Sequence, residues 1–475
     1  MSFTRAKDLG YLSPKSRIFF FRICGTLMGA CATLLKDMGY QVEGCDYTYY
    51  PPMSNYLNEK DIQCYQVSEI DEEKLKEYDL IVIGNSLSGK SEDARMVERS
   101  GVPMFSAPRV LGEILLKNRE VIGVCGTHGK TTTTFFMLQV LKKLGENPGY
   151  LIGGVLDGMP SASLGSTPYF LIESDEYDTS YFEKFSKFHL YQLDHVLLTS
   201  LEFDHADIYD SIDDIKNEFL RLFAQLRSSL FYSLDYPVIQ EVLDKKSLFQ
   251  SIHHYGDTSE NGPRMISESP KGSLFEITWK KENFQFKTNL IGKHNIFNLS
   301  AVILWCLNKD FPVEKIQEAC LDLSLVKRRQ EVRGHYKGSV VIDDFAHHPR
   351  AVDLTLKGLK TKYSGKKLIA VLEPISATAR SQIFEQEFTD ALRNADISII
   401  VKPSFETSVK DQKTINTARM STELSSAGIE SYNVEELKNL RILLSQLAGD
   451  DSIIVVMSNR TCLGLWESDF VQEII

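Results

Sequence analysis

Short apolar runs alternate with amphipathic stretches along the chain. Residues 18–24 have the length and composition of a buried strand, residues 41–45 are expected to form a second strand, and residues 80–83 a third. Between the first two, residues 25–39 begin with a glycine turn and continue with helical spacing. The order predicts a doubly wound βαβ module, in which the glycine turn and the strand ends face a ligand.

The alternation continues through the middle of the chain. A strand is expected to begin at residues 121–122, and a helix with one apolar face at residues 135–144. Two more buried strands are expected at 170–172 and 196–199. Residues 227–290 have the pattern of short strands and turns, and a helix then runs through Leu307.

A third set of α/β elements follows. The pattern predicts a helix at residues 351–360 and four strands, at 340–343, 368–372, 397–401 and 453–457. A chain of 475 residues is long enough for about three domains. We expect an α/β protein with a Rossmann-like N-terminal domain (1–118), a P-loop ATPase-like central domain (119–331) and a Rossmann-like C-terminal domain (332–475).

The segment Gly-Val-Cys-Gly-Thr-His-Gly-Lys-Thr-Thr-Thr-Thr occupies residues 123–134. A strand, a glycine loop, Lys-Thr and a helix form the layout of a phosphate-binding loop. The N–H groups and the helix N-terminus favour an anion, Lys130 would reach the terminal phosphates and Thr131 would hold Mg²⁺. The GxxxxGK[ST] spacing is not met, because Val124 replaces its first glycine. A glycine-rich turn capped by threonines is the alternative.

Acidic clusters follow the next two strands. Glu-Ser-Asp-Glu-Tyr-Asp covers residues 173–178, and Glu-Phe-Asp-His-Ala-Asp covers residues 202–207. Carboxylates at the ends of parallel strands lie beside such a loop, where Mg²⁺ needs oxygen ligands. A solvated turn and a surface loop are the alternatives.

Three weaker signals complete the pattern. Asn295 and Asn298 lie one turn apart on a helix and can both bond an adenine edge, unless Asn295 only caps the helix. In the run 327–329, Arg329 could reach a γ-phosphate, or all three cations could be solvated. The N-terminal glycine fingerprint is incomplete because Arg22 replaces its first glycine, so a simple packing turn is a fair alternative there.

Composition narrows the class of protein. The net charge is −11 and no long basic run occurs, which argues against nucleic acid as a partner. Eight scattered cysteines without a CxxC pair argue for reduced thiols and against a zinc site. No run of about 18 apolar residues occurs, so we expect no membrane span and a cytoplasmic protein.

Together the motifs resemble the Mur ligases, the ATP-dependent amide-forming ligases of peptidoglycan assembly. GTHGKTTT, ESDEYD, EFDHAD, GKHNIFN, KRR and DDFAHHP occur in the family's order. Within the family, YPPMS (50–54), LIGGV (151–155) and DDFAHHP (343–349) are most similar to the recycling branch. That branch joins UDP-N-acetylmuramate to the murein tripeptide L-alanyl-γ-D-glutamyl-meso-diaminopimelate.

The resemblance implies a role for each matching residue. Catalysis would depend on Lys130, Glu173, His205 and Arg329, and Mg²⁺ would be held by Thr131, Glu173 and His205. ATP would also contact Gly126, Thr127, Gly129, Lys130, Thr131, Thr132, Asn295, Asn298, Arg329 and Asp344. The UDP-sugar would contact Gly25, Thr26, Met28, Asp46 and His128, and the peptide would contact His347, His348 and Arg380.

The chain departs from the family at several positions. Phe219 or Leu220 stands where many members carry a carbamylated lysine, and Lys216 is one turn early, so we expect no such lysine. Ile375 follows Pro374 where the recycling branch has an arginine, and the glycines expected after Asn459 are missing. The alanine ligase of the same family therefore stays an alternative, as does a nucleotide-gated module without catalysis. We expect a monomer or a weak homodimer.

Overall fold

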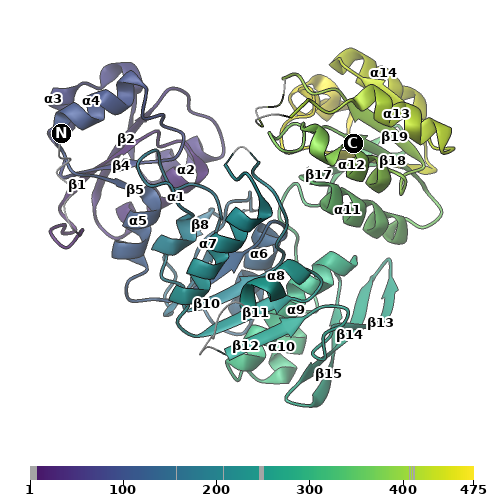
Figure 1. The fold of residues 1–475 in the computed structure, drawn as a ribbon, viewed down its shortest axis with the longest axis horizontal. Coiled ribbons are helices and arrows are strands. Elements are labelled where there is room, and N and C mark those ends of the chain that lie inside the picture. The colour runs from purple at the N-terminus through teal and green to yellow at the C-terminus, as the bar shows by residue number, and fades with distance from the viewer. Residues whose placement is uncertain are drawn as a thin grey trace. The chain divides into compact units, whose positions relative to one another are not determined.

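The computed structural model describes residues 8–156, 158–206, 208–244, 251–405, 407, 409 and 412–475. Two compact units account for the chain. Unit 1 comprises Met1–Glu202, Asp213–Tyr255 and Ala301–Asp310, and unit 2 comprises Phe203–Ile212, Gly256–Ser300 and Phe311–Ile475. The ribbon in Figure 1 follows the chain through both units.

Unit 1 begins with a five-stranded parallel sheet in the order β3-β2-β1-β4-β5. Its strands are β1 (Arg17–Phe21), β2 (Gln41–Asp46), β3 (Gln63–Gln66), β4 (Leu80–Ile83) and β5 (Met104–Ser106). Its helices are α1 (Thr26–Asp37), α2 (Met53–Glu59), α3 (Glu72–Leu75), α4 (Glu92–Ser100) and α5 (Ala107–Val110). Phe19 and Phe21 pack against Leu75 and Val97 on one face. Helices shield the sheet from water, which explains the continuous apolar runs.

The second sheet of unit 1 carries the phosphate-loop sequence and has the order β12-β11-β10-β6-β9-β7-β8. Its strands are β6 (Glu120–Cys125), β7 (Gly149–Leu151), β8 (Ala162–Ser163), β9 (Tyr169–Glu173), β10 (His195–Leu198), β11 (Ser229–Ser233) and β12 (Ser251–Tyr255). Its helices include α6 (Lys130–Lys143), α7 (Ile212–Gln225) and α8 (Pro237–Leu243). Because β6 lies between β9 and β10 and is parallel to both, the loops that follow these three strands meet at one edge.

Unit 2 contains an antiparallel meander and a mainly parallel sheet of order β16-β17-β21-β18-β19-β20. The meander consists of β13 (Arg264–Ser269), β14 (Gly272–Trp279) and β15 (Glu282–Thr288). The second sheet consists of β16 (Glu331–Tyr336), β17 (Ser339–Asp344), β18 (Lys367–Leu372), β19 (Ile397–Val401), β20 (Glu430–Val434) and β21 (Ser452–Met457). The helices are α9 (Lys293–Asn308), whose residues from Ala301 on belong to unit 1, α10 (Val313–Ala319), α11 (Pro349–Lys362), α12 (Glu385–Leu392), α13 (Thr417–Ser426) and α14 (Leu437–Leu447).

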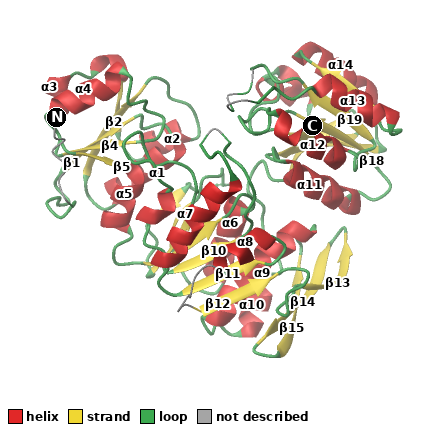
Figure 2. Ribbon diagram, in the orientation of Figure 1, coloured by secondary structure: helices red, strands yellow, loops and turns green. Residues whose placement is uncertain are grey.

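Helices cover both faces of this six-stranded sheet (Figure 2). Leu356 of α11, Phe388 of α12 and Leu424 of α13 belong to the core on one face. Leu440 of α14 packs in the core on the other face, together with Phe470. The sheet thus has a helical layer on each side, as expected for an α/β unit.

The predicted α/β fold class is confirmed, with differences in detail. The helix expected at residues 135–144 begins at Lys130, because Gly129, with φ of 83°, ends the loop before the threonines. The stretch 227–290 also contains α8. Arg22 has φ of 69°, so it adopts the left-handed conformation of the glycine that it replaces. The domain boundaries after residues 118 and 331 stay a prediction. Among the described residues, no helix has the length and apolar character needed to cross a bilayer.

Candidate phosphate and magnesium site

The loop between β6 and α6 has a backbone that only glycine tolerates at two positions. Gly126 has φ of 127° and Gly129 has φ of 83°. A Cβ atom on Gly126 would lie 2.6 Å from Thr199 Oγ1 and 2.8 Å from the backbone nitrogen of Ser200. The loop therefore lies directly on the segment that follows β10, without room for a side chain at Gly126.

Polar contacts fix the loop on that segment. The His128 N–H donates to Ser200 Oγ at 2.7 Å, and the Thr199 hydroxyl donates to the His128 carbonyl. The Glu202 N–H donates to Thr127 Oγ1 at 2.9 Å. The His128 imidazole lies 3.1 Å from the Glu202 carboxylate. The loop is thus held in shape by the chain after β10.

Lys130, the first residue of α6, extends back over the loop. Its ammonium donates to the Gly126 carbonyl at 2.6 Å and to Glu176 Oε2 at 3.2 Å, and lies 3.8 Å from Asp175. Burial disfavours the ammonium, but the charges of Glu176 and Asp175 outweigh burial and raise the pKa of Lys130. Lys130 therefore carries a fixed positive charge where the N-terminus of α6 also favours an anion.

Thr131 and Glu173 meet beside Lys130. The Thr131 hydroxyl donates to Glu173 Oε2 at 3.1 Å, and the Gly153 N–H donates to Glu173 Oε1 at 2.9 Å. Burial, assisted by the charge of Asp175, raises the pKa of Glu173 to about 7. A hydroxyl oxygen and a carboxylate oxygen at this spacing suit Mg²⁺, which prefers hard oxygen ligands. Thr132, the next residue, is buried.

The sugar-binding residues expected in the first sheet surround the start of α1. Gly25 precedes the helix, Thr26 is exposed at its first position, and Met28 is buried. Asp46 accepts the Cys24 N–H at 2.8 Å, and its carboxylate also lies 3.0 Å from Arg22 Nε. Asp46 therefore shapes the loop between β1 and α1, and its contact with a ligand stays a prediction.

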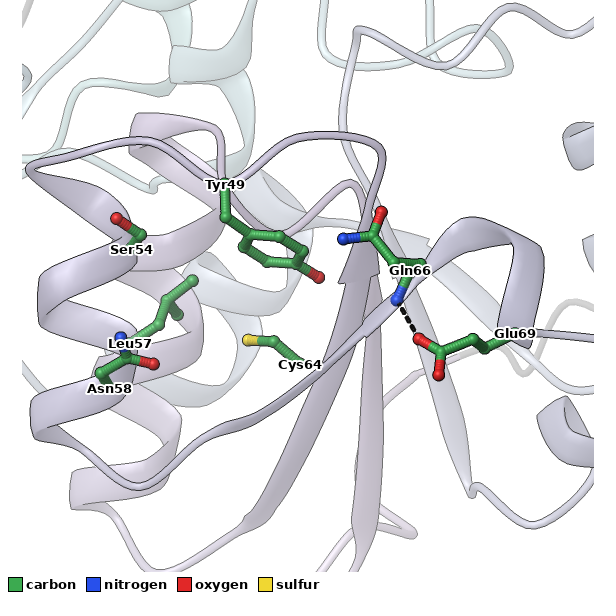
Figure 3. A pocket seen from close by; sticks show the side chains of 7 residues that line it. All are labelled: Tyr49, Ser54, Leu57, Asn58, Cys64, Gln66 and Glu69. Carbon is green, nitrogen blue, oxygen red and sulfur yellow. Dashed lines mark hydrogen bonds between the residues drawn. The ribbon is translucent and has the colours of Figure 1, made fainter.

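A cavity of about 330 Å³ lies between α2 and β3 in this part of unit 1 (Figure 3). Its lining mixes amide, hydroxyl and carboxylate groups with a ring and an aliphatic chain. The lining residues are Tyr49, Ser54, Leu57, Asn58, Cys64, Gln66 and Glu69. Sequence reasoning missed this cavity, because its walls come from separate elements that share no motif.

Unit 2 holds His205, whose backbone has φ of 55° and donates to Asp204 Oδ1 at 2.7 Å. Asp204 is buried. Burial would raise its pKa, but the nearby imidazoles of His205, His347 and His348 outweigh burial and lower it. Three predicted site histidines thus act on the charge of one carboxylate. Asp204 lies inside the EFDHAD motif but received no role from the sequence.

Other predicted residues of unit 2 occupy well-defined positions. Asp344 accepts the N–H groups of Gln330 and Ala346 at 2.8 and 2.7 Å. Burial raises the pKa of Asp344, opposed by the charge of Arg329. The guanidinium carbon of Arg329 lies 4.8 Å from the centre of the Phe345 ring.

The adenine and peptide candidates of unit 2 are also placed. Asn295 and Asn298 are both buried in α9, which begins at Lys293, and Asn295 Nδ2 donates to the Ile291 carbonyl at 2.8 Å. Arg380 donates to the Ile375 carbonyl at 2.8 Å, whereas its Nε is buried with no hydrogen-bond partner among the described residues. Arg380 therefore keeps one donor free. The substrate contacts of all these residues stay predictions.

Comparison with known proteins accounts for this combination of features. Three family models match: "Mur ligase family, catalytic domain" over residues 17–119, "Mur ligase middle domain" over 124–306, and "Mur ligase, glutamate ligase domain" over 328–460. Together they span most of the chain.

Individual relatives and a solved structure are similar to the chain over most of its length. UDP-N-acetylmuramate–L-alanyl-γ-D-glutamyl-meso-2,6-diaminoheptandioate ligase from Haemophilus influenzae is 32% identical over 455 residues, covering 94% of this chain and 97% of the relative. The ligase of the same name from Escherichia coli is 33% identical, covering 82% and 85%. The crystal structure of a murein peptide ligase from Psychrobacter arcticus matches with a TM-score of 0.70 and 27% identity, covering 95% and 97%. The chain belongs to the Mur ligase family.

Proposed function

We propose that the chain is the ATP-dependent ligase that joins the carboxylate of UDP-N-acetylmuramate to the L-alanine amine of L-alanyl-γ-D-glutamyl-meso-diaminopimelate, in peptidoglycan recycling. Two relatives whose names state this pair of substrates are 32% and 33% identical to it over most of its length. The observation in the structure that carries the proposal is the group of Lys130, Thr131 and Glu173 at the phosphate loop.

This group suits a magnesium nucleotide. Lys130 and the N-terminus of α6 would bind the phosphates of ATP, with Gly126, Thr127, Gly129 and Thr132 along the loop. Thr131 and Glu173 would hold Mg²⁺ with His205 as a further ligand, and the ion would offset negative charge on the transferred phosphoryl group. In unit 2, Asn295 and Asn298 would bind adenine, and Arg329 and Asp344 would orient ATP.

The chemistry follows from the weakness of a carboxylate as an electrophile. Attack of one carboxylate oxygen on the γ-phosphorus forms a new P–O bond and breaks the bond to the β-phosphate oxygen, which releases ADP. The resulting acyl phosphate has a good leaving group. The peptide amine attacks its carbonyl carbon, loses a proton and expels inorganic phosphate. Lys130 and Arg329 would offset the repulsion between the two anionic substrates.

The remaining residues are proposed to bind the two organic substrates. Gly25, Thr26, Met28, Asp46 and His128 would contact the sugar nucleotide, whose base the cavity between α2 and β3 can receive. His347, His348 and Arg380 would contact the peptide. We propose the three domains 1–118, 119–331 and 332–475 for these tasks. All eight cysteines are free thiols, which supports a cytoplasmic location.

A panel of amines tests the proposal. Purified protein receives ATP, Mg²⁺, UDP-N-acetylmuramate and either L-alanine, the dipeptide, or a tripeptide ending in diaminopimelate or lysine, and mass spectrometry identifies the product. We expect the diaminopimelate tripeptide to be used best, and Lys130→Met to make no product. The alanine ligase is the second candidate, because Ile375 stands in the place of an arginine expected to line the peptide site. Preferential use of L-alanine would establish that candidate, and no product from any amine would support a non-catalytic module.

A further inference from the structure

A second lysine is buried beside the phosphate loop and takes no part in the mechanism above. Lys187 is the first residue of a short 3-10 helix, η3 (Lys187–Leu190), and its side chain is 6% exposed. Its ammonium lies 3.8 Å from the centre of the Tyr177 ring and 3.5 Å from Asp175 Oδ2. A lysine is almost never buried to this degree unless it is paired, so the ion pair with Asp175 accounts for its position.

Asp175 connects this lysine with the phosphate loop. One of its carboxylate oxygens faces Lys187, and the other lies 3.8 Å from the ammonium of Lys130. Lys130 also contacts Glu176, whose side chain is 3% exposed. Two ammonium groups therefore share one carboxylate in a poorly hydrated place, where charges act on each other more strongly than in water.

The charges of this cluster decide how it receives an anion. Two carboxylates, from Asp175 and Glu176, face two ammonium groups, so the fully ionised cluster is neutral. Without Lys187 the same cluster would have a net charge of −1. ATP is itself highly anionic, so the additional negative charge would oppose its phosphates.

The turn that carries Lys187 is fixed from outside the site. Glu218 of α7 accepts the Ser186 N–H at 3.1 Å and the Ser186 hydroxyl at 2.8 Å, and contacts His189 Nε2 at 2.9 Å. The residues before and after Lys187 are thus held by one buried carboxylate. The lysine is positioned by the fold and not by a flexible loop.

We propose that Lys187 is a positioning residue for nucleotide binding: it neutralises and orients Asp175, so that Lys130 remains over the phosphate loop and the site accepts a polyphosphate. The inference rests on the proposed binding of ATP at this loop. The effect of Lys187 on nucleotide affinity should increase with the negative charge of the nucleotide, because the effect is electrostatic. A lysine that only supported the fold would affect ATP and ADP equally.

The test measures the affinity of the full-length protein for Mg·ATP and Mg·ADP by isothermal titration calorimetry. Lys187→Met should weaken ATP binding about ten-fold and ADP binding clearly less. Lys187→Arg should stay within about three-fold of the unmutated protein, because a guanidinium keeps the charge and can stack on Tyr177. Lys184→Met is the matched control, since Lys184 is 64% exposed and pairs with Asp178 instead of Asp175.

Three results would overturn the inference: unchanged ATP affinity in Lys187→Met, an equal loss for ATP and ADP, or an equal loss in Lys184→Met. If Lys187→Met does not fold, Lys187→Gln gives the answer, because its amide can still bond Asp175 but carries no charge, so ATP binding should again fall about ten-fold. Unchanged ATP binding there contradicts the inference. Lys130→Met distinguishes this inference from the proposed function. If Lys130→Met abolishes nucleotide binding and Lys187→Met preserves it, only the role of Lys187 is refuted. Absence of ATP binding by the unmutated chain refutes both.

Discussion

The carboxylate of Glu218 should contribute to stability in a way that depends on pH. It accepts bonds from the Ser186 N–H and hydroxyl, contacts His189, and lies 2.8 Å from Arg221. Burial alone would raise its pKa, but the bonds from His189 and Ser186 outweigh burial and lower the pKa from 4.5 to about 2. Glu218→Gln keeps the shape of the side chain and removes its charge.

The size of the effect follows from the shift. Each unit of pKa shift corresponds to 1.36 kcal/mol, so the lowered pKa of Glu218 contributes about 3 kcal/mol to the free energy of unfolding. We expect Glu218→Gln to reduce the free energy of unfolding by about 2–3 kcal/mol at pH 7. Because the folded pKa is depressed, this stability is present above pH 4.5 and is lost as the pH falls toward 2. The difference between the two proteins should shrink over the same range.

Urea denaturation followed by circular dichroism at pH 7 and at successively lower pH measures this difference. Hydrogen exchange of residues 186–190 reports the local effect, which matters because a chain with two compact units need not unfold in one step. Arg221→Ala is the control: its side chain is 66% exposed, so it should change stability by less than about 0.5 kcal/mol. Equal urea midpoints at pH 7, or a difference that does not decrease toward pH 3, would refute the reasoning.

Three further changes have expected outcomes. Gly126→Ala should weaken ATP binding at least about ten-fold in a calorimetric titration, because its Cβ would contact Thr199 Oγ1 at 2.6 Å; unchanged affinity would contradict the close approach. Glu373→Gln should lower the free energy of unfolding by about 1–3 kcal/mol and speed hydrogen exchange of residues 458–463, because the carboxylate accepts hydrogen bonds from the Ser458 hydroxyl and from two backbone N–H groups. Unchanged hydrogen exchange in these residues would contradict this role. Arg328→Lys should lower the melting temperature, because a lysine cannot bond Asp343 and two loop carbonyls together; an unchanged melting curve would show that these bonds add little.

The fold could be predicted where one local signal dominates. Residues 18–21 of β1 and residues 80–83 of β4 are apolar throughout because helices cover their sheet, and no other element fits such short runs. The start of α6 could not be placed, because a run of threonines has weak helix propensity. In the structure Thr133 and Thr134 are completely buried, so packing overrides that propensity.

The site residues also divide into those that the sequence could bring together and those that it could not. Lys130, Thr131 and Glu173 could be brought together from the sequence, because each follows a parallel strand of one sheet. Lys187 could not, since it lies on a short turn without a motif and becomes significant only through Asp175. For Asp46 the family resemblance implied a contact with the UDP-sugar, which stays a prediction, and only the structure shows that its carboxylate accepts the Cys24 N–H.

The central claim is that the phosphate loop delivers the γ-phosphoryl group of ATP to the sugar carboxylate, and isotope transfer tests it most directly. UDP-N-acetylmuramate labelled with ¹⁸O in its carboxylate is converted with ATP and the tripeptide, and the released inorganic phosphate is analysed by mass spectrometry. The account predicts one ¹⁸O atom in each phosphate released from fully labelled substrate, because the acyl phosphate loses its carboxylate oxygen to phosphorus. Unlabelled phosphate accompanying normal amide formation would contradict the account.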